Sequence, residues 1–270
     1  MTLGVVMTRP LALVTGASSG IGAALAADLA ADGHDLVLVA RRQERLLELQ
    51  ERFAALGATT EILAEDLSDP AGLERVVARA GAGDVDLLVS NAGVSAYGPF
   101  AELDPEALRR AWTLNADATP LLTRAVLPGM LERSRGGIIT VASTLAFSAG
   151  IATAPDGGRG LPQRALYVAA KAGIVAFTRV LAGELAGTGV RATVVCPGLV
   201  SSEWNGGASV VPAAMTPEDV AVAALAGFER GEVICLPGLE DVGLLERLAE
   251  SEQGITSGNI RPTLAQRYTA

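Results

Sequence analysis

The sequence predicts an α/β protein: a doubly wound parallel sheet of about seven strands with helices on both faces. Short apolar runs alternate along the chain with segments of helical periodicity, which is the order of strand–helix–strand units. The runs LVLVA, DLLVS and ATVVC are apolar throughout, as expected of strands that are covered on both faces. No Gly-, Ser- or Pro-rich linker divides the 270 residues, so residues 1–270 are predicted to form one domain.

Seven runs of aliphatic and β-branched residues are the expected strands. They are Leu11–Thr15, Asp35–Ala40, Thr59–Ala64, Val85–Ser90, Gly137–Ala142, Val190–Val195 and Glu232–Leu236. Apolar residues recur with helical spacing in the segments between these runs. The expected helices are Gly20–Ala31, Gln43–Leu56, Pro70–Ala80, Pro105–Arg133, Leu166–Gly187 and Pro217–Glu229.

Composition limits the class of protein. Half of the residues are hydrophobic and 19% are charged, which excludes an intrinsically disordered chain. The net charge of −9 disfavours a nucleic-acid-binding protein, because such a protein needs a basic face. Two cysteines, Cys196 and Cys235, are too few for a disulfide framework and are expected to be small buried hydrophobic residues. His34 is the only histidine, so no metal site is predicted.

The expected location is the cytoplasm. The N-terminal sequence MTLGVVMTRP lacks the basic region and apolar run of a signal peptide. The most apolar long stretch, from Ala165 to Gly187, contains Lys171, Arg179 and Glu184, which argues against a membrane-spanning helix.

A glycine-rich segment, Thr15-Gly-Ala-Ser-Ser-Gly-Ile-Gly22, follows the first expected strand and begins the first helix. Glycines permit a tight turn and a close approach of backbone N–H groups to a ligand, and the helix N-terminus favours a pyrophosphate. The glycine spacing alone would also fit an ordinary strand–helix turn. Because strand, turn and helix occur together, the segment predicts a Rossmann-like dinucleotide site. Its candidate cofactor-binding residues are Gly16, Ser18, Ser19, Gly20, Ile21 and Gly22.

The end of the second expected strand selects between the two nicotinamide cofactors. About 20 positions beyond the glycines, an acidic residue would bind a ribose 2′-hydroxyl, whereas an arginine would accommodate a 2′-phosphate. This sequence has Arg41 and Arg42 there, and no carboxylate precedes Glu44. A guanidinium suits a phosphate, so NADP(H) is favoured. NAD(H) stays open, because the two arginines could instead belong to a solvated helix start.

Tyr167 and Lys171 are spaced at i and i+4, which places a phenol and an ammonium one turn apart on one face of an expected helix. A free tyrosine has a pKa of about 10, and lowering it to about 7 needs on the order of 4 kcal/mol. A neighbouring ammonium and an oxidised nicotinamide could supply this in a partly desolvated site. Tyr167 could then take a proton from an alcohol or donate one to a carbonyl. The spacing alone occurs by chance in many helices.

Further short motifs follow in a fixed order along the chain. They are Asp66-Leu67, Asn91-Ala-Gly93, Asn115, Ser143 and Pro197-Gly198, in addition to the glycine segment and the Tyr167/Lys171 pair. Over nearly the whole chain this order resembles the classical short-chain dehydrogenase/reductase family. Its extended members, with a different glycine spacing and longer chains, fit less well. The resemblance implies an NAD(P)-dependent oxidoreductase that interconverts a carbonyl and a secondary alcohol by hydride transfer.

The resemblance also implies a role for each matching residue. Tyr167 would be the general acid/base, and Lys171 would hold the nicotinamide ribose and lower the pKa of Tyr167. Ser143 would hydrogen-bond the substrate oxygen, and Asn115 would support a water that relays protons to Lys171. Besides the glycine segment and the two arginines, the implied cofactor contacts are Asp66, Leu67, Asn91, Ala92, Gly93, Tyr167, Lys171, Pro197, Gly198, Val200 and Ser202.

One departure from the family pattern bears on the site. Ser143 and Tyr167 are 24 positions apart, more than is usual in the family, and the extra residues form a glycine-rich insertion at 144–164. We interpret the insertion as a substrate-side lid or an oligomer contact. If it displaces Ser143, the serine assignment fails, and Ser148 is a weaker substitute. A second hypothesis would then stay open: a cofactor-binding sensor or scaffold protein without turnover.

The substrate-side segment is expected at residues 199–216, which in the family closes over the substrate. A pocket walled by Trp204, Val210, Val211 and Met215 would suit an apolar carbonyl compound. No binding code in the sequence identifies the substrate itself.

We expect a homodimer or a homotetramer. The expected helix Leu166–Gly187 is apolar on nearly every face, and such a helix must be covered by its own core or by a partner. The resemblance implies that this helix and the helix with Asn115 form the interface. The other expected partner is a small-molecule carbonyl or alcohol, and neither nucleic acid nor a membrane is expected.

Overall fold

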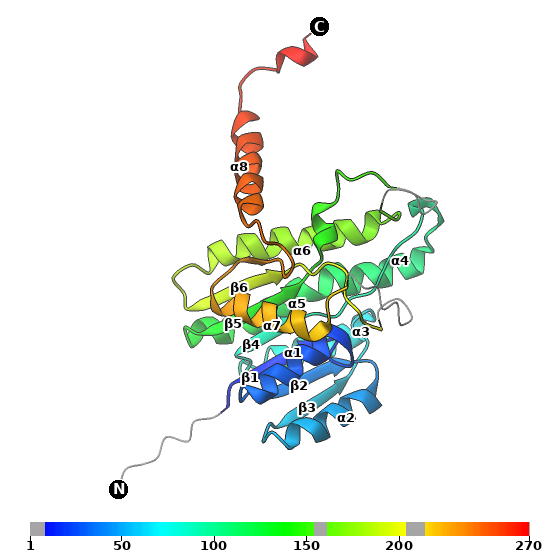
Figure 1. The fold of residues 1–270 in the computed structure, drawn as a ribbon, viewed down its shortest axis with the longest axis vertical. Coiled ribbons are helices and arrows are strands. Elements are labelled where there is room, and N and C mark those ends of the chain that lie inside the picture. The colour runs from blue at the N-terminus through cyan, green and yellow to red at the C-terminus, as the bar shows by residue number, and fades with distance from the viewer. Residues whose placement is uncertain (1–8, 154–160, 204–213, 270) are drawn as a thin grey trace. The chain divides into compact units, whose positions relative to one another are not determined.

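The computed structural model describes residues 9–153, 161–203 and 214–269 of the chain. Contacts within it divide the chain into two compact units, Met1–Pro237 and Gly238–Ala270. The first unit contains the sheet and helices α1 to α7 (Figure 1). One domain over residues 1–270 therefore stays a prediction, while the predicted strands and helices all belong to the first unit.

Seven parallel strands form one sheet in the order β3-β2-β1-β4-β5-β6-β7. They are β1 (Leu11–Thr15), β2 (Asp35–Ala40), β3 (Thr60–Ala64), β4 (Leu87–Ser90), β5 (Gly136–Val141), β6 (Val190–Val195) and β7 (Ile234–Cys235). The chain runs outward from β1 to β3, returns to place β4 beside β1, and then continues to β7. The predicted doubly wound α/β fold is confirmed. In such sheets ligands bind at the carboxyl ends of the strands, where the strand order reverses.

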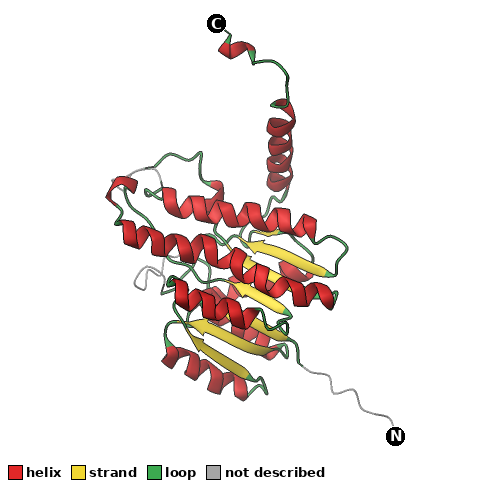
Figure 2. Ribbon diagram, turned by 180° about the vertical axis from the view of Figure 1, so that it is seen from behind, coloured by secondary structure: helices red, strands yellow, loops and turns green. Residues whose placement is uncertain are grey.

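Helices cover both faces of the sheet (Figures 1 and 2). One core joins the sheet to α1, α2 and α7 and includes Val14, while the other joins it to α3, α5 and α6 and includes Leu13. Val14 and Leu13 belong to opposite cores because successive side chains of a strand point to opposite faces. The helices of the first unit are α1 (Gly20–Ala31), α2 (Gln43–Ala54), α3 (Pro70–Ala80), α4 (Pro105–Trp112), α5 (Ala118–Glu132), α6 (Ala165–Glu184) and α7 (Pro217–Glu229).

The predicted helix Pro105–Arg133 differs in one detail that matters for the site. A π-helical turn, η2 (Thr113–Asp117), lies between α4 and α5 and contains Asn115. Single π turns within helices are frequent at functional sites. Apolar periodicity could not reveal the turn, because the apolar spacing continues through it.

The last predicted strand, Glu232–Leu236, is shorter in the structure, where it forms β7 and pairs with β6 alone.

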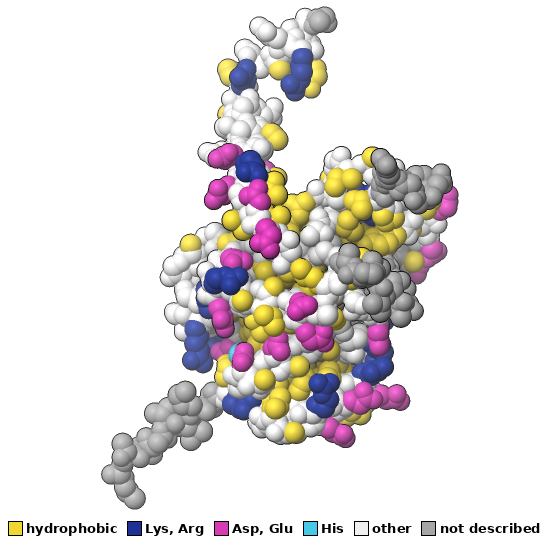
Figure 3. Space-filling view, viewed as in Figure 1, with side chains coloured by type: hydrophobic (Ala, Val, Ile, Leu, Met, Phe, Trp, Pro, Cys, Tyr) yellow, Lys and Arg dark blue, Asp and Glu magenta, His cyan; other side chains and the backbone are white. Residues whose placement is uncertain are grey.

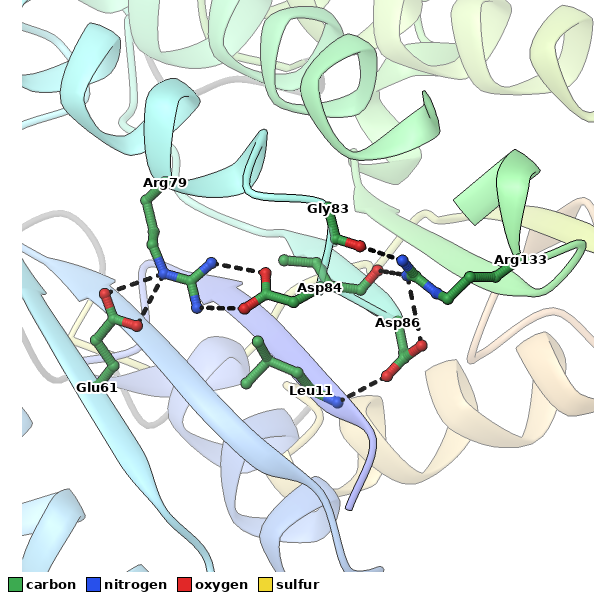
Figure 4. Close-up of polar contacts among 8 residues, drawn as sticks. Leu11, Glu61, Arg79, Gly83, Asp84, Asp86 and Arg133 are labelled. Atoms are coloured by element: carbon green, nitrogen blue, oxygen red, sulfur yellow. Dashed lines mark hydrogen bonds and ion pairs between the residues drawn. The ribbon is translucent and has the colours of Figure 1, made fainter. Parts of the chain in front are cut away.

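Arg79, near the C-terminus of α3, forms two ion pairs at the amino end of the sheet (Figure 4). Its Nε lies 2.8 Å from Glu61 Oε2, and its Nη1 lies 2.8 Å from Asp84 Oδ1. The guanidinium therefore ties α3 to β3 and to the turn before β4.

Arg133, directly after α5, makes a second network at the same end (Figure 4). It donates hydrogen bonds to the backbone carbonyls of Gly83 and Val85, and its Nη2 lies 3.5 Å from Asp86 Oδ1. Asp86 Oδ2 accepts a further hydrogen bond from the Leu11 N–H at 3.1 Å. These contacts connect the starts of β1 and β4 to the end of α5.

The second unit contains α8 (Gly243–Gly258) and a short 3₁₀ turn, η4 (Gln266–Tyr268). α8 lies outside the predicted helices, and none of its residues is buried. Within the unit, Arg247 Nη2 lies 2.9 Å from Asp241 Oδ2.

On the molecular face shown in Figure 3, acidic and basic side chains are interspersed, so this face carries no large patch of one charge.

Candidate active site

A cavity of about 780 Å³ lies at the carboxyl ends of the strands, within the volume range of small-molecule and cofactor sites. Residues at or after the ends of β1 to β6 line it, together with residues of α6. The predicted site residues in its wall are Gly16, Ser18, Ser19, Gly20, Ile21, Arg41, Arg42, Asp66, Leu67, Asn91, Ala92, Gly93, Ser143, Tyr167, Lys171, Pro197, Gly198, Val200 and Ser202. Gly22 and Asn115 do not line the cavity and instead pack against residues that do.

The turn after β1 is held closely against the segment after β4. Thr15 Oγ1 accepts hydrogen bonds from the N–H groups of Asn91 and Ala92, at 2.9 and 3.0 Å. A Cβ at Gly16, whose φ is +67°, would lie 2.7 Å from Asn91 Nδ2. A Cβ at Gly22 would lie 2.4 Å from the Gly16 carbonyl oxygen. Both glycines are therefore needed for this close packing.

The N-terminus of α1 borders the cavity through Gly20 and Ile21. Its N-cap residue, Ser19, makes no side-chain hydrogen bond to the first turn. In α3, by contrast, Asp69 accepts a hydrogen bond from the Gly72 N–H at 3.0 Å. The first turn of α1 is thus not capped by its own N-cap side chain, and its N–H groups and helix dipole suit an anion such as a pyrophosphate.

Arg42 lies between the end of β2 and the start of α2. Its Nη2 donates hydrogen bonds to Ser18 Oγ at 3.0 Å and to Ser19 Oγ at 2.6 Å. Its Nη1 donates to Glu203 Oε2 at 2.7 Å. Arg41 beside it also lines the cavity. A guanidinium grouped with hydroxyls is a donor set that fits a phosphate, so the residues present fit a 2′-phosphorylated dinucleotide.

Asp66 is fixed by neighbouring side chains. Its Oδ1 accepts hydrogen bonds from the Ser68 N–H and hydroxyl at 2.9 and 2.7 Å, and its Oδ2 accepts one from Arg110 at 2.7 Å. Burial alone would raise the pKa of Asp66. The Ser68 hydrogen bonds and the charges of Arg41 and Arg110 outweigh burial and hold the pKa below its ordinary value. The carboxylate is therefore charged and oriented at neutral pH, and it lines the cavity beside Leu67.

Asn115 is buried in η2, and both polar atoms of its side chain bond to the backbone of Val94. Its Nδ2 donates to the Val94 carbonyl at 2.9 Å, and its Oδ1 accepts from the Val94 N–H at 3.1 Å. A Cβ at Gly93 would lie 3.0 Å from Asn115 Oδ1 and 3.4 Å from Lys171 Nζ. The absence of a side chain at Gly93 therefore lets Asn115 and Lys171 approach the same point behind the cavity wall.

Lys171 is buried in α6, and its Nζ donates a hydrogen bond to the Val141 carbonyl at 2.9 Å. Within the described part of the chain, no carboxylate forms an ion pair with it. Burial lowers the pKa of Lys171 to about 8, although nearby Cys196 acts in the opposite direction. Lys171 therefore gains and loses its proton close to neutral pH.

Tyr167 lies one helical turn before Lys171, and the Nζ of Lys171 is 5.8 Å from the centre of its ring. Burial raises the pKa of Tyr167 above its ordinary value, Tyr97 adds to this, and a hydrogen bond with the Ser143 side chain acts in the opposite direction. The lowered Tyr167 pKa expected from the sequence is thus not found in the protein alone, because burial of the phenol dominates. Tyr167 keeps its proton at neutral pH.

Ser143 is the N-cap residue of η3 (Thr144–Phe147), and its side chain reaches Tyr167 although the two residues are 24 positions apart. The insertion therefore leaves Ser143 in the site. Ser148, the weaker candidate, is engaged elsewhere: its Oγ accepts a hydrogen bond from Arg164 Nε at 3.1 Å.

Arg164, directly before α6, holds the described ends of the insertion together. It is buried, and it donates hydrogen bonds to the carbonyl groups of Ser148 at 2.9 Å and Pro162 at 3.0 Å. Leu161 and Pro162 line the cavity. Residues 154–160 of the insertion lie outside the described residues.

The segment after β6 forms the rim of the cavity opposite the glycine turn. A Cβ at Gly20 would lie 3.4 Å from Ser202 Cβ, so the two rims come into contact there. Met215 was predicted to line the substrate pocket, but it does not line the cavity. It forms a β-bridge with Val200 and packs against the core of the sheet. Three other residues predicted for the substrate pocket lie outside the described residues: Trp204, Val210 and Val211.

The sequence motifs gave no role to several residues in or beside the cavity, among them Tyr97, Arg164 and Glu203. The Tyr97 ring meets the Tyr167 ring edge-on, with the ring centres 5.3 Å apart and an interplanar angle of 78°. Its closeness in sequence to Gly93 could have suggested a place near the site. Arg164 and Glu203 carried no such signal, because their contacts depend on how loops fold back onto distant segments.

The two cysteines of the chain are buried and protonated. Both cysteines are buried and free, as predicted, and burial raises the pKa of Cys196 to about 12 and of Cys235 to about 11. Neither is a thiolate at neutral pH.

By length and composition, the helix α6 could cross a membrane. However, 44% of its most apolar stretch is already buried inside the protein, where α6 contributes Tyr167 and Lys171 to the cavity.

Comparison with protein families and known proteins gives consistent matches. A family model described as short chain dehydrogenase matches residues 10–209. A short chain dehydrogenase of Pseudocercospora fijiensis is 40% identical over 197 residues, which cover 71% of this chain and 60% of that protein. The matched part is thus less than two thirds of that relative's length.

Two solved structures match over almost the whole chain. A short-chain dehydrogenase from Sphingobium yanoikuyae in complex with NADPH has a TM-score of 0.86 and 34% identity, covering 96% of this chain and 100% of that one. A bulky-bulky ketone specific alcohol dehydrogenase from Comamonas testosteroni has a TM-score of 0.85 and 30% identity, covering 97% and 99%. Both likenesses extend well beyond the residues that the family model matches.

Proposed function

Because this chain belongs to the short-chain dehydrogenase family, as its motifs predicted, we propose that it is an NADP(H)-dependent oxidoreductase that interconverts a carbonyl and a secondary alcohol. The observation that carries the proposal is the meeting of Tyr167, Ser143 and Lys171 on the wall of one cavity with a phosphate-binding donor set. The family identifies the chain as an oxidoreductase. The substrate, the cofactor and the roles of the residues are our proposal.

Tyr167 is the proposed general acid in the reductive direction. When bound, the nicotinamide supplies a hydride to the carbonyl carbon or accepts one from the alcohol carbon. Tyr167 gives its proton to the carbonyl oxygen, since its raised pKa keeps it protonated at neutral pH. The Ser143 hydroxyl donates a hydrogen bond to the same oxygen as negative charge develops on it. In the oxidative direction a tyrosinate takes the alcohol proton.

Lys171 is the group that we propose stabilises the tyrosinate in this buried site. Its ammonium lies on the same helix face as Tyr167 and stabilises the negative charge that proton donation leaves. Burial lowers the pKa of Lys171 and raises that of Tyr167, so the ammonium is the stronger acid and can return a proton to the tyrosinate. Asn115 supports it as a positioning residue, by fixing the backbone of Val94 beside Gly93.

NADP(H) is the proposed cofactor. Arg41 and Arg42 lie at the carboxyl end of β2, and Arg42 already binds the hydroxyl of Ser18, so this corner can donate several hydrogen bonds to a 2′-phosphate. The similar Sphingobium yanoikuyae protein was solved with NADPH, which agrees with this assignment.

A bulky, apolar ketone is the proposed substrate class. Several apolar and aromatic side chains line the cavity: Val94, Tyr97, Leu145, Leu161 and Leu199. Apolar walls around a few convergent polar groups are typical of sites for apolar small molecules. The similar Comamonas testosteroni enzyme is named for bulky-bulky ketones, which favours the same class.

We further propose a cytoplasmic homodimer or homotetramer. Leu121 and Leu131 on α5 and Val180 on α6 are exposed, and a second copy would cover this apolar surface. Light scattering on the purified chain would measure a mass of two or four copies. A monomer at micromolar concentration would contradict this part of the proposal.

The function is tested by following nicotinamide absorbance with the purified chain. We expect NADPH to be consumed with aryl or branched ketones and more slowly with acetone, and NADH to be a poorer cofactor. Arg41→Ala and Arg42→Ala should reduce the preference for NADPH, whereas Arg109→Ala, an exposed arginine paired with Glu106 outside the cavity, should not. Equal use of NADH and NADPH, or a preference that survives both substitutions, would contradict the cofactor assignment.

A further inference from the structure

We propose that Glu203 is a specificity-determining residue that competes with the cofactor 2′-phosphate for Arg42. The proposal deepens the function proposed above and rests on it, because it concerns the same phosphate corner. Glu203 lies in the substrate-side segment predicted at 199–216, but no motif of the sequence assigned it a role. Its contacts in the folded chain do.

Glu203 reaches Arg42 across the mouth of the cavity. Its Oε2 lies 2.7 Å from Arg42 Nη1, and its Oε1 lies 3.7 Å from Arg45 Nη2. Arg42 is 161 positions before Glu203 in the sequence. Arg42 and Arg45 both lie at the beginning of α2. Ser202, the preceding residue, lies against Gly20 of the glycine turn. The rim after β6 is thus anchored to both sides of the phosphate corner.

The carboxylate is charged when it makes this contact. Hydrogen bonding from Arg42 and the Arg42 charge hold the pKa of Glu203 below its ordinary value, with a smaller effect of Arg45. At neutral pH a full negative charge therefore stands beside the guanidinium that is proposed to bind the 2′-phosphate.

Arg42 has few donors left for an incoming phosphate. Its Nη1 bonds to Glu203, while its Nε and Nη2 bond to the hydroxyls of Ser18 and Ser19. A serine hydroxyl can rotate and donate a hydrogen bond to a phosphate oxygen, so Ser18 and Ser19 can become partners of the ligand. A carboxylate has no proton to donate. It must leave Arg42 or stay close to a second anion, and both weaken phosphate binding.

The competition applies to the 2′-phosphate alone. NADH presents a neutral ribose hydroxyl at this corner and does not need the Arg42 charge. Glu203 therefore narrows the preference for NADPH over NADH that Arg41 and Arg42 create. The interaction is exposed, so salt screens it and its size is modest.

Calorimetric titration with adenosine 2′,5′-bisphosphate and with ADP tests the proposal without catalysis. Glu203→Gln should bind the bisphosphate about threefold more tightly than the wild type does, with ADP binding unchanged, as the loss of one exposed charge pair predicts. The matched control is Glu48→Gln, which removes the same charge from a carboxylate that lies 3.8 Å from Arg45 and does not contact Arg42. It should leave both affinities unchanged. NADPH and NADH should follow the bisphosphate and ADP respectively.

A double mutant ties the effect to the proposed contact. In an Arg42→Met background, Glu203→Gln should no longer improve bisphosphate binding, because the contested donor is gone. Unchanged or weaker bisphosphate binding by Glu203→Gln overturns the inference, while a wild-type preference for the bisphosphate over ADP would leave the proposed cofactor intact. If wild type and Glu203→Gln both bind the two nucleotides equally, both the inference and the NADP(H) assignment fail.

Discussion

Charged side chains at the two ends of the sheet have different surroundings. At the amino end, Arg79 lies between Glu61 and Asp84, and Arg133 binds two backbone carbonyls near Asp86 (Figure 4). At the carboxyl end, Lys171 is buried and bonds to one backbone carbonyl. Both arginines have carboxylates nearby, whereas no carboxylate in the described part of the chain forms an ion pair with Lys171.

This difference separates stability from function. Among the described residues Lys171 has no ion-pair partner, and burial of its ammonium destabilises the folded state, which is why its pKa is lowered. The same environment keeps Tyr167 protonated and places an ammonium beside it, which proton transfer to a carbonyl requires. The two arginines at the amino end thus serve stability, whereas Lys171 at the carboxyl end serves chemistry at the expense of stability. Four predictions test this contrast, from the largest expected effect to the smallest.

Tyr167→Phe should lower kcat for ketone reduction by about 10²–10⁴-fold, the usual contribution of a positioned general acid. The phenol proton is lost while the ring that packs against Tyr97 is kept, so the melting temperature should change little. Steady-state kinetics and calorimetry measure the two quantities. Tyr268→Phe, at an exposed tyrosine of the second unit, is the matched control. Full activity of Tyr167→Phe would refute the proposed mechanism.

Lys171→Met should abolish most activity and yet stabilise the fold at pH 7 by about 2 kcal/mol. A pKa lowered from 10.5 to about 8 corresponds to roughly 3 kcal/mol, and the lost hydrogen bond to Val141 offsets about 1 kcal/mol. Urea denaturation gives the free energy of unfolding. A destabilised Lys171→Met variant would show that the lysine is needed for folding and would remove the contrast between the two ends.

Arg133→Met should have the opposite signature, with a loss of about 1–2 kcal/mol in unfolding free energy and kcat within about twofold of the wild type. The substitution leaves the carbonyls of Gly83 and Val85 without their donor and Asp86 without one of its cations. Because both variants replace a cation with methionine, they form a matched pair. Equal signs of the two stability changes would break the comparison.

The stability gap between wild type and Lys171→Met should narrow by about 1 kcal/mol from pH 7.5 to pH 9. Between a folded pKa of about 8 and the ordinary 10.5, the unfolded chain binds more protons at Lys171 than the folded chain does, so wild-type stability gains from this residue as pH rises. Cys196 and Cys235 act oppositely above about pH 9, since burial raises their pKa values, but they are common to both proteins. Urea titrations at several pH values measure the gap, and a pH-independent gap would mean that Lys171 does not titrate in this range.

Local patterns were sufficient for most of the fold. The runs of residues in β1, β2 and β6 predicted these strands to the residue, because both their faces are covered and nearly every position is buried and apolar or small. The pattern overestimated the length of the edge strand β7 and also of β4, which pairs on both sides and begins at Leu87 instead of Val85. The helix α8 has no buried face, so no apolar periodicity pointed to it.

By itself, the sequence determined the strand–helix order, the glycine turn, the two arginines after β2 and the Tyr167/Lys171 spacing. These features are local, set by backbone conformation and by one turn of helix. Tertiary structure alone decided that Ser143 reaches Tyr167 across the insertion, that burial raises the pKa of Tyr167, and that Glu203 meets Arg42. Each of these depends on desolvation or on the approach of distant segments, and neither quantity is encoded in the spacing of residues along the chain.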